Sequence, residues 1–218
     1  MSLQAITVLP ETGQPPTGLI VLLHGWGSNA LDVNALATLL KLPTCEMIFP
    51  NAPLPHPSTI GGRMWYAFPD RYSFQSTEGL ERQADLASSA RLLTDWIKAL
   101  PEQTGVPLSR TILGGFSQGG AMTLQVGTAL PLAGLMVLSG YLHTPIQSEN
   151  FQASRLLVVH GRQDQAVPLV AAHQARDRLL ALGAKVDYRE LDIGHEIPPV
   201  VVDLMRSFII DVFDKNEV

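Results

Sequence analysis

The chain has 218 residues, of which 46% are hydrophobic and 16% charged, so it can bury one large core and fits a single domain over residues 1–218. A formal net charge of -5, with no block of Lys or Arg, argues against nucleic acid or an anionic membrane surface as the main partner. Cys45 is the only cysteine, which rules out an internal disulfide, and no Cys/His cluster has zinc-ligand spacing. The first residues lack a signal-peptide pattern and no stretch approaches a membrane span, so we expect a cytoplasmic protein with no integral membrane association.

Strand and helix patterns alternate along the chain. Short segments rich in Val, Ile, Leu or Phe predict strands over 5–9, 19–25, 46–50, 111–116, 134–140, 155–161 and 185–191, most of them buried on both faces. Apolar residues spaced by three and four predict helices over 80–100, in the stretch after Ser117, over 170–182 up to Gly183, and over 199–213. Alternating strands and helices need crossover connections, so the sequence predicts an α/β fold with a mostly parallel sheet and helices on both faces.

The interval 51–77, NAPLPHPSTIGGRMWYAFPDRYSFQST, fits neither the helix period nor the strand period. A loop of this length is uncommon in a compact domain unless it serves as a lid or as the wall of a binding site. The alternative is an ordered surface excursion held in place by Trp65 and Phe68. We favour the interpretation as a lid or wall.

The segment ILGGFSQGGAM carries the pattern G-x-S-x-G over Gly115, Ser117 and Gly119. The pattern alone is weak evidence, because about one chain in fifteen of this length has it by chance. Here it follows a predicted buried strand and opens a helical stretch, which is the context of a nucleophile on a sharp strand-to-helix turn. Such a turn strains the serine backbone and leaves room only for glycine on either side. We interpret Ser117 as a nucleophile; the alternative is a glycine-rich turn with Ser117 as a helix N-cap.

A serine nucleophile needs a histidine base that is held by a carboxylate. His195 follows the last predicted strand and Asp164 follows the strand before it, so both lie on loops at the carboxyl end of the sheet, where ligands meet such sheets. Asp192 is the rival acid, but it stands too close to His195 in sequence to support the far side of the imidazole ring. The histidines that we interpret as structural are His56, His143, His160 and His173.

Acyl transfer also needs hydrogen-bond donors for the oxyanion of the tetrahedral intermediate. The backbone amide of Gln118 is one candidate, because it directly follows the nucleophile, and we expect Gln118 to act through this amide more than through its side chain. The segment LLHGWGSNALD follows an early strand, and we assign the second donor to the backbone amide of Trp26. Two alternatives stay open: His24 in the same segment only braces that loop by hydrogen bonds, and Trp26 is a packing residue whose amide points elsewhere.

With these pieces in this order, the chain resembles the phospholipase/carboxylesterase family of small α/β-hydrolases, which includes bacterial carboxylesterases and acyl-protein thioesterases. The matching segments are LLHGWG, FPNAP, GGRMWY, GFSQGGAM, LSGYL, HGRQDQAVP and GHEIPP. They extend from near residue 19 to the last helix. Two departures, Trp26 where relatives often have Leu and Ala166 where many carry a larger apolar residue, leave the substrate preference open.

The resemblance implies an α/β-hydrolase fold and a serine hydrolase that cleaves short-to-medium acyl esters, lysophospholipids or acyl-thioesters without a metal or organic cofactor. It assigns Ser117, Asp164 and His195 to the catalytic triad, and the amides of Trp26 and Gln118 to the oxyanion hole. The candidate substrate-binding residues are Trp65, Ala166 and Val167. Too few residues separate the predicted strands at 134–140 and 155–161 for a cap domain, which leaves the interval 51–77 as the expected cover.

Other interpretations stay open at this point. The fold could serve as a ligand-binding or signalling module with little turnover, although the intact set of catalytic residues argues against it. A dienelactone hydrolase would be favoured by a cysteine nucleophile, but Cys45 lies far from the G-x-S-x-G turn. An acylated protein is an alternative to a small or lipid-like ester as the substrate, and a homodimer is an alternative to a monomer.

Overall fold

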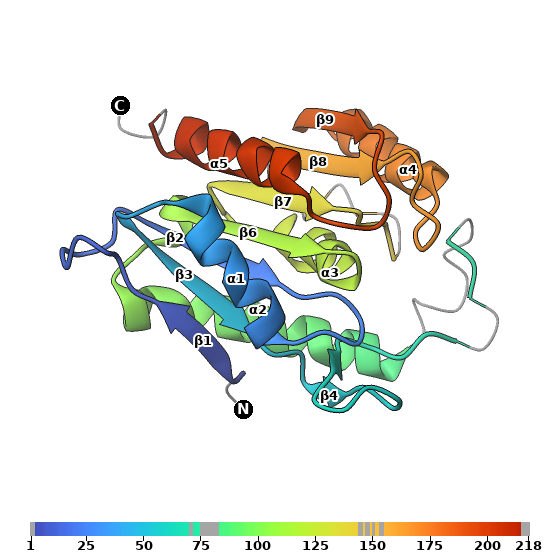
Figure 1. Cartoon of the computed structure of the whole chain (residues 1–218), viewed down its shortest axis with the longest axis horizontal. Helices are drawn as coiled ribbons and strands as arrows, with labels where there is room; N and C mark the ends of the chain where they lie inside the picture. The colour runs from blue at the N-terminus through green and yellow to red at the C-terminus, as the bar shows by residue number, and fades with distance from the viewer. Residues whose placement is uncertain are drawn as a thin grey trace.

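The computed structural model describes residues 3–69, 72–74, 83–143, 146, 149, 151–152 and 155–214. Seven strands form one sheet in the order β1-β3-β2-β6-β7-β8-β9 (Figure 1). Every neighbouring pair is parallel except β1 and β3, which are antiparallel. The strands are β1 (Ala5–Val8), β2 (Gly18–Leu23), β3 (Cys45–Pro50), β6 (Thr111–Phe116), β7 (Gly134–Leu138), β8 (Arg155–Gly161) and β9 (Lys185–Leu191).

Helices cover both faces of this sheet, as Figure 1 shows. One face packs on α1 (Ala30–Leu40) and α5 (Pro199–Asp214). The other face packs on α2 (Ala84–Thr104), α3 (Gln118–Gly127) and α4 (Leu169–Ala181), and a short 3₁₀ helix, Leu108–Arg110, precedes β6. In β2, Leu19, Val21 and Leu23 face the second layer, whereas Ile20 and Leu22 face the first. This alternation explains why β2 is apolar at every position, since both of its faces are buried.

The predicted fold class is confirmed: the chain forms an α/β-hydrolase fold with a mostly parallel sheet. All seven predicted strands and the helices after Ser117, at 170–182 and at 199–213 are present, with small shifts at their ends. The predicted helix at 80–100 is observed as α2 from Ala84, and residues 80–82 lie outside the described part of the chain.

The sequence analysis did not predict α1, which follows the glycine-containing segment after β2. Its apolar stripe is short, with only Ala30, Leu36 and Leu40 buried. Asn29 could have indicated the start of α1 in the sequence, because Asn before an apolar run is a favoured N-cap.

The interval 51–77 is more ordered than a plain loop within the residues described. It contains a two-stranded antiparallel sheet of β4 (Leu54–Pro55) and β5 (Arg63–Met64). Trp65 is buried and Phe68 is partly buried against the core. Residues 70–71 and 75–77 of the predicted lid lie outside the described residues. Within the described ranges, no helix combines the length and apolar character needed to cross a membrane.

We predict that Asn29→Ala lowers the free energy of unfolding by about 1 kcal/mol, because it removes an N-cap. The Asn29 Oδ1 atom accepts hydrogen bonds from the backbone amides of Leu31 (2.8 Å) and Asp32 (3.2 Å). Urea denaturation followed by circular dichroism measures the change. Asn29→Asp keeps the acceptor and serves as the control; an equal loss in both variants would contradict the capping role.

Candidate active site

Ser117 lies on a strained turn between β6 and α3. Its backbone has φ 53° and ψ -117°, a conformation that residues with a Cβ atom rarely adopt. The flanking glycines are required by close contacts: a Cβ atom on Gly115 would lie 2.3 Å from the backbone of Gly119. A Cβ atom on Gly119 would lie 2.4 Å from the carbonyl oxygen of Leu23. The G-x-S-x-G pattern is therefore explained by backbone packing on both sides of the serine.

Asp164 and His195 form a hydrogen-bonded pair on the loops after β8 and β9. The His195 Nδ1 atom lies 2.7 Å from Asp164 Oδ2. The other carboxylate oxygen accepts from the backbone amides of Ala166 (2.9 Å) and Val167 (2.8 Å). Burial by itself raises the pKa of Asp164, but the hydrogen bonds from His195 and the two amides outweigh it and hold the pKa below its ordinary value. A charged Asp164 fixes the proton of a neutral His195 ring on Nδ1, which leaves Nε2 as a base.

The structure brings His195 to the end of β6 that carries Ser117. The ring of His195 packs on Phe116, the residue before the serine, with ring centroids 4.6 Å apart. No hydrogen bond joins the hydroxyl of Ser117 to His195 among the residues described. Catalytic hydrogen bonds are often long without substrate and shorten when it binds, so the arrangement is compatible with a nucleophile and its base.

The two predicted oxyanion donors lie on adjoining loops. In the described part of the chain, no carbonyl oxygen accepts from the backbone amide of Trp26 or of Gln118. Gln118 is the first residue of α3, where amides have no partner within the helix and the helix dipole favours negative charge. The loops are in contact, because a Cβ atom on Gly25 would lie 3.4 Å from the Cβ atom of Ser117.

The side chain of Gln118 has a function that the sequence analysis missed. It is buried, and its Oε1 atom accepts from the backbone amide of Trp65 (2.8 Å) while its Nε2 atom donates to the carbonyl of Tyr66 (2.8 Å). The indole Nε1 atom of Trp65 donates to the carbonyl of His24 (3.0 Å). The side chain of Gln118 therefore joins α3 to residues 65 and 66, which the expectation of a mainly backbone role did not include; a role of its amide in an oxyanion hole stays a prediction.

The three predicted substrate-binding residues differ in their exposure. Trp65 has 0% exposed surface, so in this structure it packs inside the protein behind the candidate site. Val167 is buried in a small cluster with Ala121 and Tyr141, whereas Ala166 is exposed. The aromatic rings that cover this cluster come from Phe68, Tyr72 and Phe74. Contact of any of these residues with substrate stays a prediction.

The remaining histidines have structural partners. His24 Nε2 accepts from the amide of Ala52 (3.0 Å), Nδ1 donates to the carbonyl of Gly25 (2.7 Å), and burial lowers its pKa to about 4. The ring thus braces the loop before Trp26 by hydrogen bonds, which was one of the alternatives left open by the sequence. His160 Nε2 lies 2.8 Å from the carbonyl of Val167, and burial lowers its pKa.

His143 is buried with its Nε2 atom 2.6 Å from the hydroxyl of Tyr66, and burial lowers its pKa to about 3. His173 pairs with Glu190 at 2.7 Å. Asp192, the rival acid, pairs with Arg162 at 2.8 Å. These pairings agree with the interpretation of the rings as structural and with the choice of Asp164 over Asp192.

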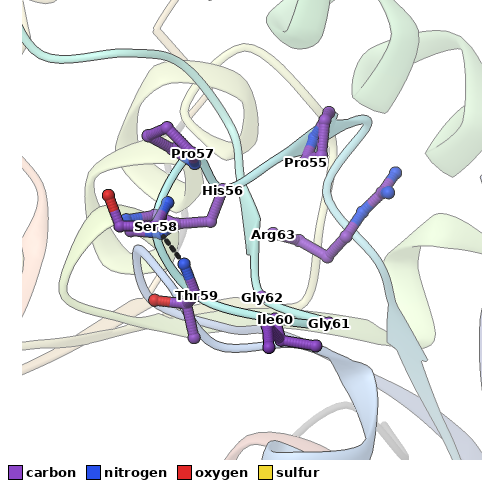
Figure 2. Close-up of a pocket in the computed structure, with 9 residues that line it drawn as sticks. All are labelled: Pro55, His56, Pro57, Ser58, Thr59, Ile60, Gly61, Gly62 and Arg63. Atoms are coloured by element: carbon purple, nitrogen blue, oxygen red, sulfur yellow. Dashed lines mark hydrogen bonds between the residues drawn. The ribbon is translucent and has the colours of Figure 1, made fainter.

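A cavity of ≈ 400 Å³ lies in the turn between β4 and β5 (Figure 2). His56 Nδ1 accepts from the backbone amides of Ser58 (3.2 Å) and Thr59 (3.0 Å), which shapes the turn. Figure 2 shows the guanidinium group of Arg63 directed away from these residues, and its Nε atom donates to the carbonyl of Ala52 (2.8 Å). The predicted triad residues do not line this cavity.

Comparison with known proteins identifies relatives along nearly the whole chain. The sequence model of the family described as Phospholipase/Carboxylesterase matches residues 4–212. Acyl-protein thioesterase 1 homolog 1 of Dictyostelium discoideum is 32% identical over 179 residues, which cover 78% of each chain.

Solved structures with the same fold include esterase PE8, with a TM-score of 0.87, 27% identity and coverage of 97% of this chain and 100% of that one. A phospholipase/carboxylesterase from Dyadobacter fermentans has a TM-score of 0.74, 25% identity and coverage of 96% and 97%. The likeness thus extends over the sheet, the helices and the loops of the candidate site.

We predict that Ser117→Gly is more stable than Ser117→Ala by about 1 kcal/mol, because glycine adopts the positive φ without strain. At an ordinary helical position the order is reversed and alanine is the more stable residue. Thermal and urea denaturation of the two variants measure the difference. A more stable Ser117→Ala would show that the turn is not strained.

Proposed function

Because the chain belongs to the phospholipase/carboxylesterase family, we propose that it is a serine hydrolase that cleaves carboxylic esters or thioesters through an acyl-enzyme on Ser117. The observation that carries the proposal is the pair formed by Asp164 and His195 at the end of the sheet where Ser117 occupies its strained turn. A buried carboxylate that orients a histidine beside an exposed nucleophile is the arrangement that activates serine.

In the proposed reaction, His195 Nε2 removes the proton of the Ser117 hydroxyl as its oxygen attacks the acyl carbonyl carbon. Asp164 holds the ring and stabilises the imidazolium that forms. The proton then passes from His195 to the leaving oxygen or sulfur, and the bond between the acyl carbon and that atom breaks. Water repeats the attack with His195 as base, which releases the carboxylic acid and restores Ser117.

The oxyanion is stabilised by the amides of Trp26 and Gln118 in this proposal. Two observations support this assignment: among the described residues neither amide donates to a carbonyl, and the amide of Gln118 lies at the N-terminus of α3. Fixed donors stabilise the charge that develops in the transition state without reorganisation, and each contributes roughly 3–4 kcal/mol to lowering the barrier.

The substrate class rests on apolar surface near these loops. Trp26 is 46% exposed, and its ring contacts His56 and Phe68. Ile60, in the turn between β4 and β5, is fully exposed. An open apolar rim suits a substrate whose acyl chain is buried while its alcohol or thiol part extends into solvent, such as a short-to-medium acyl ester, a lysophospholipid or an acylated protein thiol. The cytoplasm is the proposed compartment, since the chain has a single cysteine.

We predict that Ser117→Ala abolishes hydrolysis of a p-nitrophenyl ester and labelling by a fluorophosphonate probe. Asp164→Asn should lower kcat by about 10⁴-fold, because the amide no longer fixes the required tautomer of His195. Asp192→Asn is the matched control and should leave kcat unchanged, since Asp192 pairs with Arg162 on the surface. Activity near that of the wild type in Ser117→Ala would refute the proposed function.

We also predict a defined dependence on acyl-chain length, measured as kcat/KM for oxoesters from two to twelve carbons and for thioesters with the same acyl groups. Each methylene buried in the acyl site should raise kcat/KM by about fourfold until the site is filled. A parallel rise in both series would indicate one acyl site that accepts either leaving group. A response that does not vary with chain length would contradict an acyl-binding site.

A further inference from the structure

The two proposed oxyanion donors belong to separate loops, and their separation depends on what joins these loops. The amide of Trp26 belongs to the loop between β2 and α1, and the amide of Gln118 begins α3. Both must point at one oxygen atom of the substrate, so a shift of one loop relative to the other weakens the pair of hydrogen bonds. The residues that connect the loops therefore determine how well the oxyanion is held.

Trp65 bonds to both loops. Its backbone amide donates to Gln118 Oε1 (2.8 Å), and its indole Nε1 atom donates to the carbonyl of His24 (3.0 Å), two residues before Trp26. The rings of Trp65 and His24 are also in contact, with centroids 5.7 Å apart. One buried residue thus fixes the start of α3 and the loop after β2 with two directional bonds.

Neighbouring bonds hold the same segment on the far side of Trp26. The amide of Gly27 donates to the carbonyl of Arg63 (2.9 Å), and the amide of Arg63 donates to the carbonyl of Ser28 (2.7 Å). Residues 24–28 are therefore paired with residues 63–65 before and after Trp26. The Trp26 peptide has little freedom to rotate as long as these bonds are intact.

The burial of Trp65 is consistent with a role in support. With 0% exposed surface, the residue has no face open to a bound molecule, in contrast with the half-exposed Trp26. A buried indole N–H without a hydrogen-bond partner lowers the stability of the fold. Here the indole N–H of Trp65 donates to the carbonyl of His24, in the loop that carries the proposed donor. Among the described residues, the hydrogen bonds of Trp65 go to the two donor loops, through the side chain and the main chain.

We propose that Trp65 is a positioning residue that sets the separation of the two oxyanion donors, through its indole bond to His24 and its backbone bond to the side chain of Gln118. This role is separate from the predicted contact of Trp65 with substrate, and it rests on the proposed function of Ser117. The side chain of Gln118 also contributes to this positioning, because it accepts a hydrogen bond from the amide of residue 65 and donates one to the carbonyl of residue 66.

The test is Trp65→Phe, which keeps an aromatic ring and the backbone amide and removes the indole bond to His24. The smaller ring also leaves a cavity, and the control below reproduces that loss of volume. We expect kcat for a p-nitrophenyl ester to fall by about tenfold with KM unchanged, because the ground state does not use the oxyanion donors. The affinity for an aryl trifluoromethyl ketone should fall by the same factor, since Ser117 adds to its carbonyl carbon and the resulting oxyanion occupies the same donors. Concentrations of active enzyme are set by fluorophosphonate titration.

Trp96→Phe is the matched control, because Trp96 is a nearly buried core residue of α2 outside the donor loops. It should leave kcat and ketone affinity at wild-type values while lowering the thermal midpoint, as an ordinary core substitution does. Equal kinetic losses in Trp65→Phe and Trp96→Phe, or unchanged kcat and ketone affinity in Trp65→Phe, would overturn the positioning role.

Gln118→Met provides a second, independent variant if Trp65→Phe does not fold. It removes both side-chain bonds to residues 65 and 66 at similar side-chain length, and it should reproduce the loss of kcat and of ketone affinity. In the double variant the losses should be less than multiplicative, because both substitutions release the same connection. Fully multiplicative losses would overturn the inference. If Ser117→Ala is inactive while these variants equal the wild type, only the positioning role fails and the proposed function stands.

Discussion

The close approach of two backbones around Ser117 is the constraint on which the candidate site depends. Gly119 at the start of α3 lies so near the carbonyls at the end of β2 that no side chain fits between them, and Gly115 lies equally close to Gly119. This packing accompanies the positive φ of Ser117 at the turn between β6 and α3. The same packing brings the loop after β2 to the helix start, so the positions of the proposed nucleophile and of both proposed oxyanion donors follow from one contact.

Asp164 and His195, the proposed acid and base, depend on a second constraint, the pairing of the loops after β8 and β9. The amides of Arg162 and Gln163 donate to the carbonyls of Leu191 and Ile193, and a Cβ atom on Gly161 would lie 2.3 Å from the latter oxygen. These bonds hold the loop of Asp164 against the loop of His195. Burial alone would raise the pKa of Asp164, but the hydrogen bonds from His195 and from the amides of residues 166 and 167 hold this pKa below its ordinary value. The segment DQAV therefore contains both the carboxylate of Asp164 and two backbone amides that donate hydrogen bonds to it.

Features with a strong periodic or steric signal could be predicted from the sequence. The apolar strands, the helix after Ser117 and the glycines of its turn follow from burial and from backbone geometry, which local residue types reveal. α1 was missed because its apolar stripe is short, and β4 and β5 because two-residue strands carry no period. The bonds of Trp65 and Gln118 join residues 53 positions apart, and no local pattern encodes such a pairing. From the sequence, Trp65 in a loop near the site therefore predicted a substrate wall, and its burial and its polar partners became visible only in the structure.

The segment from β5 to Tyr66 consequently cannot open as a lid independently of the loop after β2 and the start of α3. Its bonds to residues 24, 27 and 28 and to Gln118 also fix the proposed oxyanion donors, so an opening at this point would disrupt the site that it exposes. The aromatic rings of Phe68, Tyr72 and Phe74 contact Tyr141, and Phe68 also contacts the ring of Trp26. Among the described residues, none of the three forms a hydrogen bond to the donor loops. A change of Tyr72 or Phe74 can therefore reshape the apolar side of the site while the proposed donors stay in place. Under the proposed function, this division lets acyl preference vary through residues after Tyr66, with the geometry of acyl transfer held constant by residues before it.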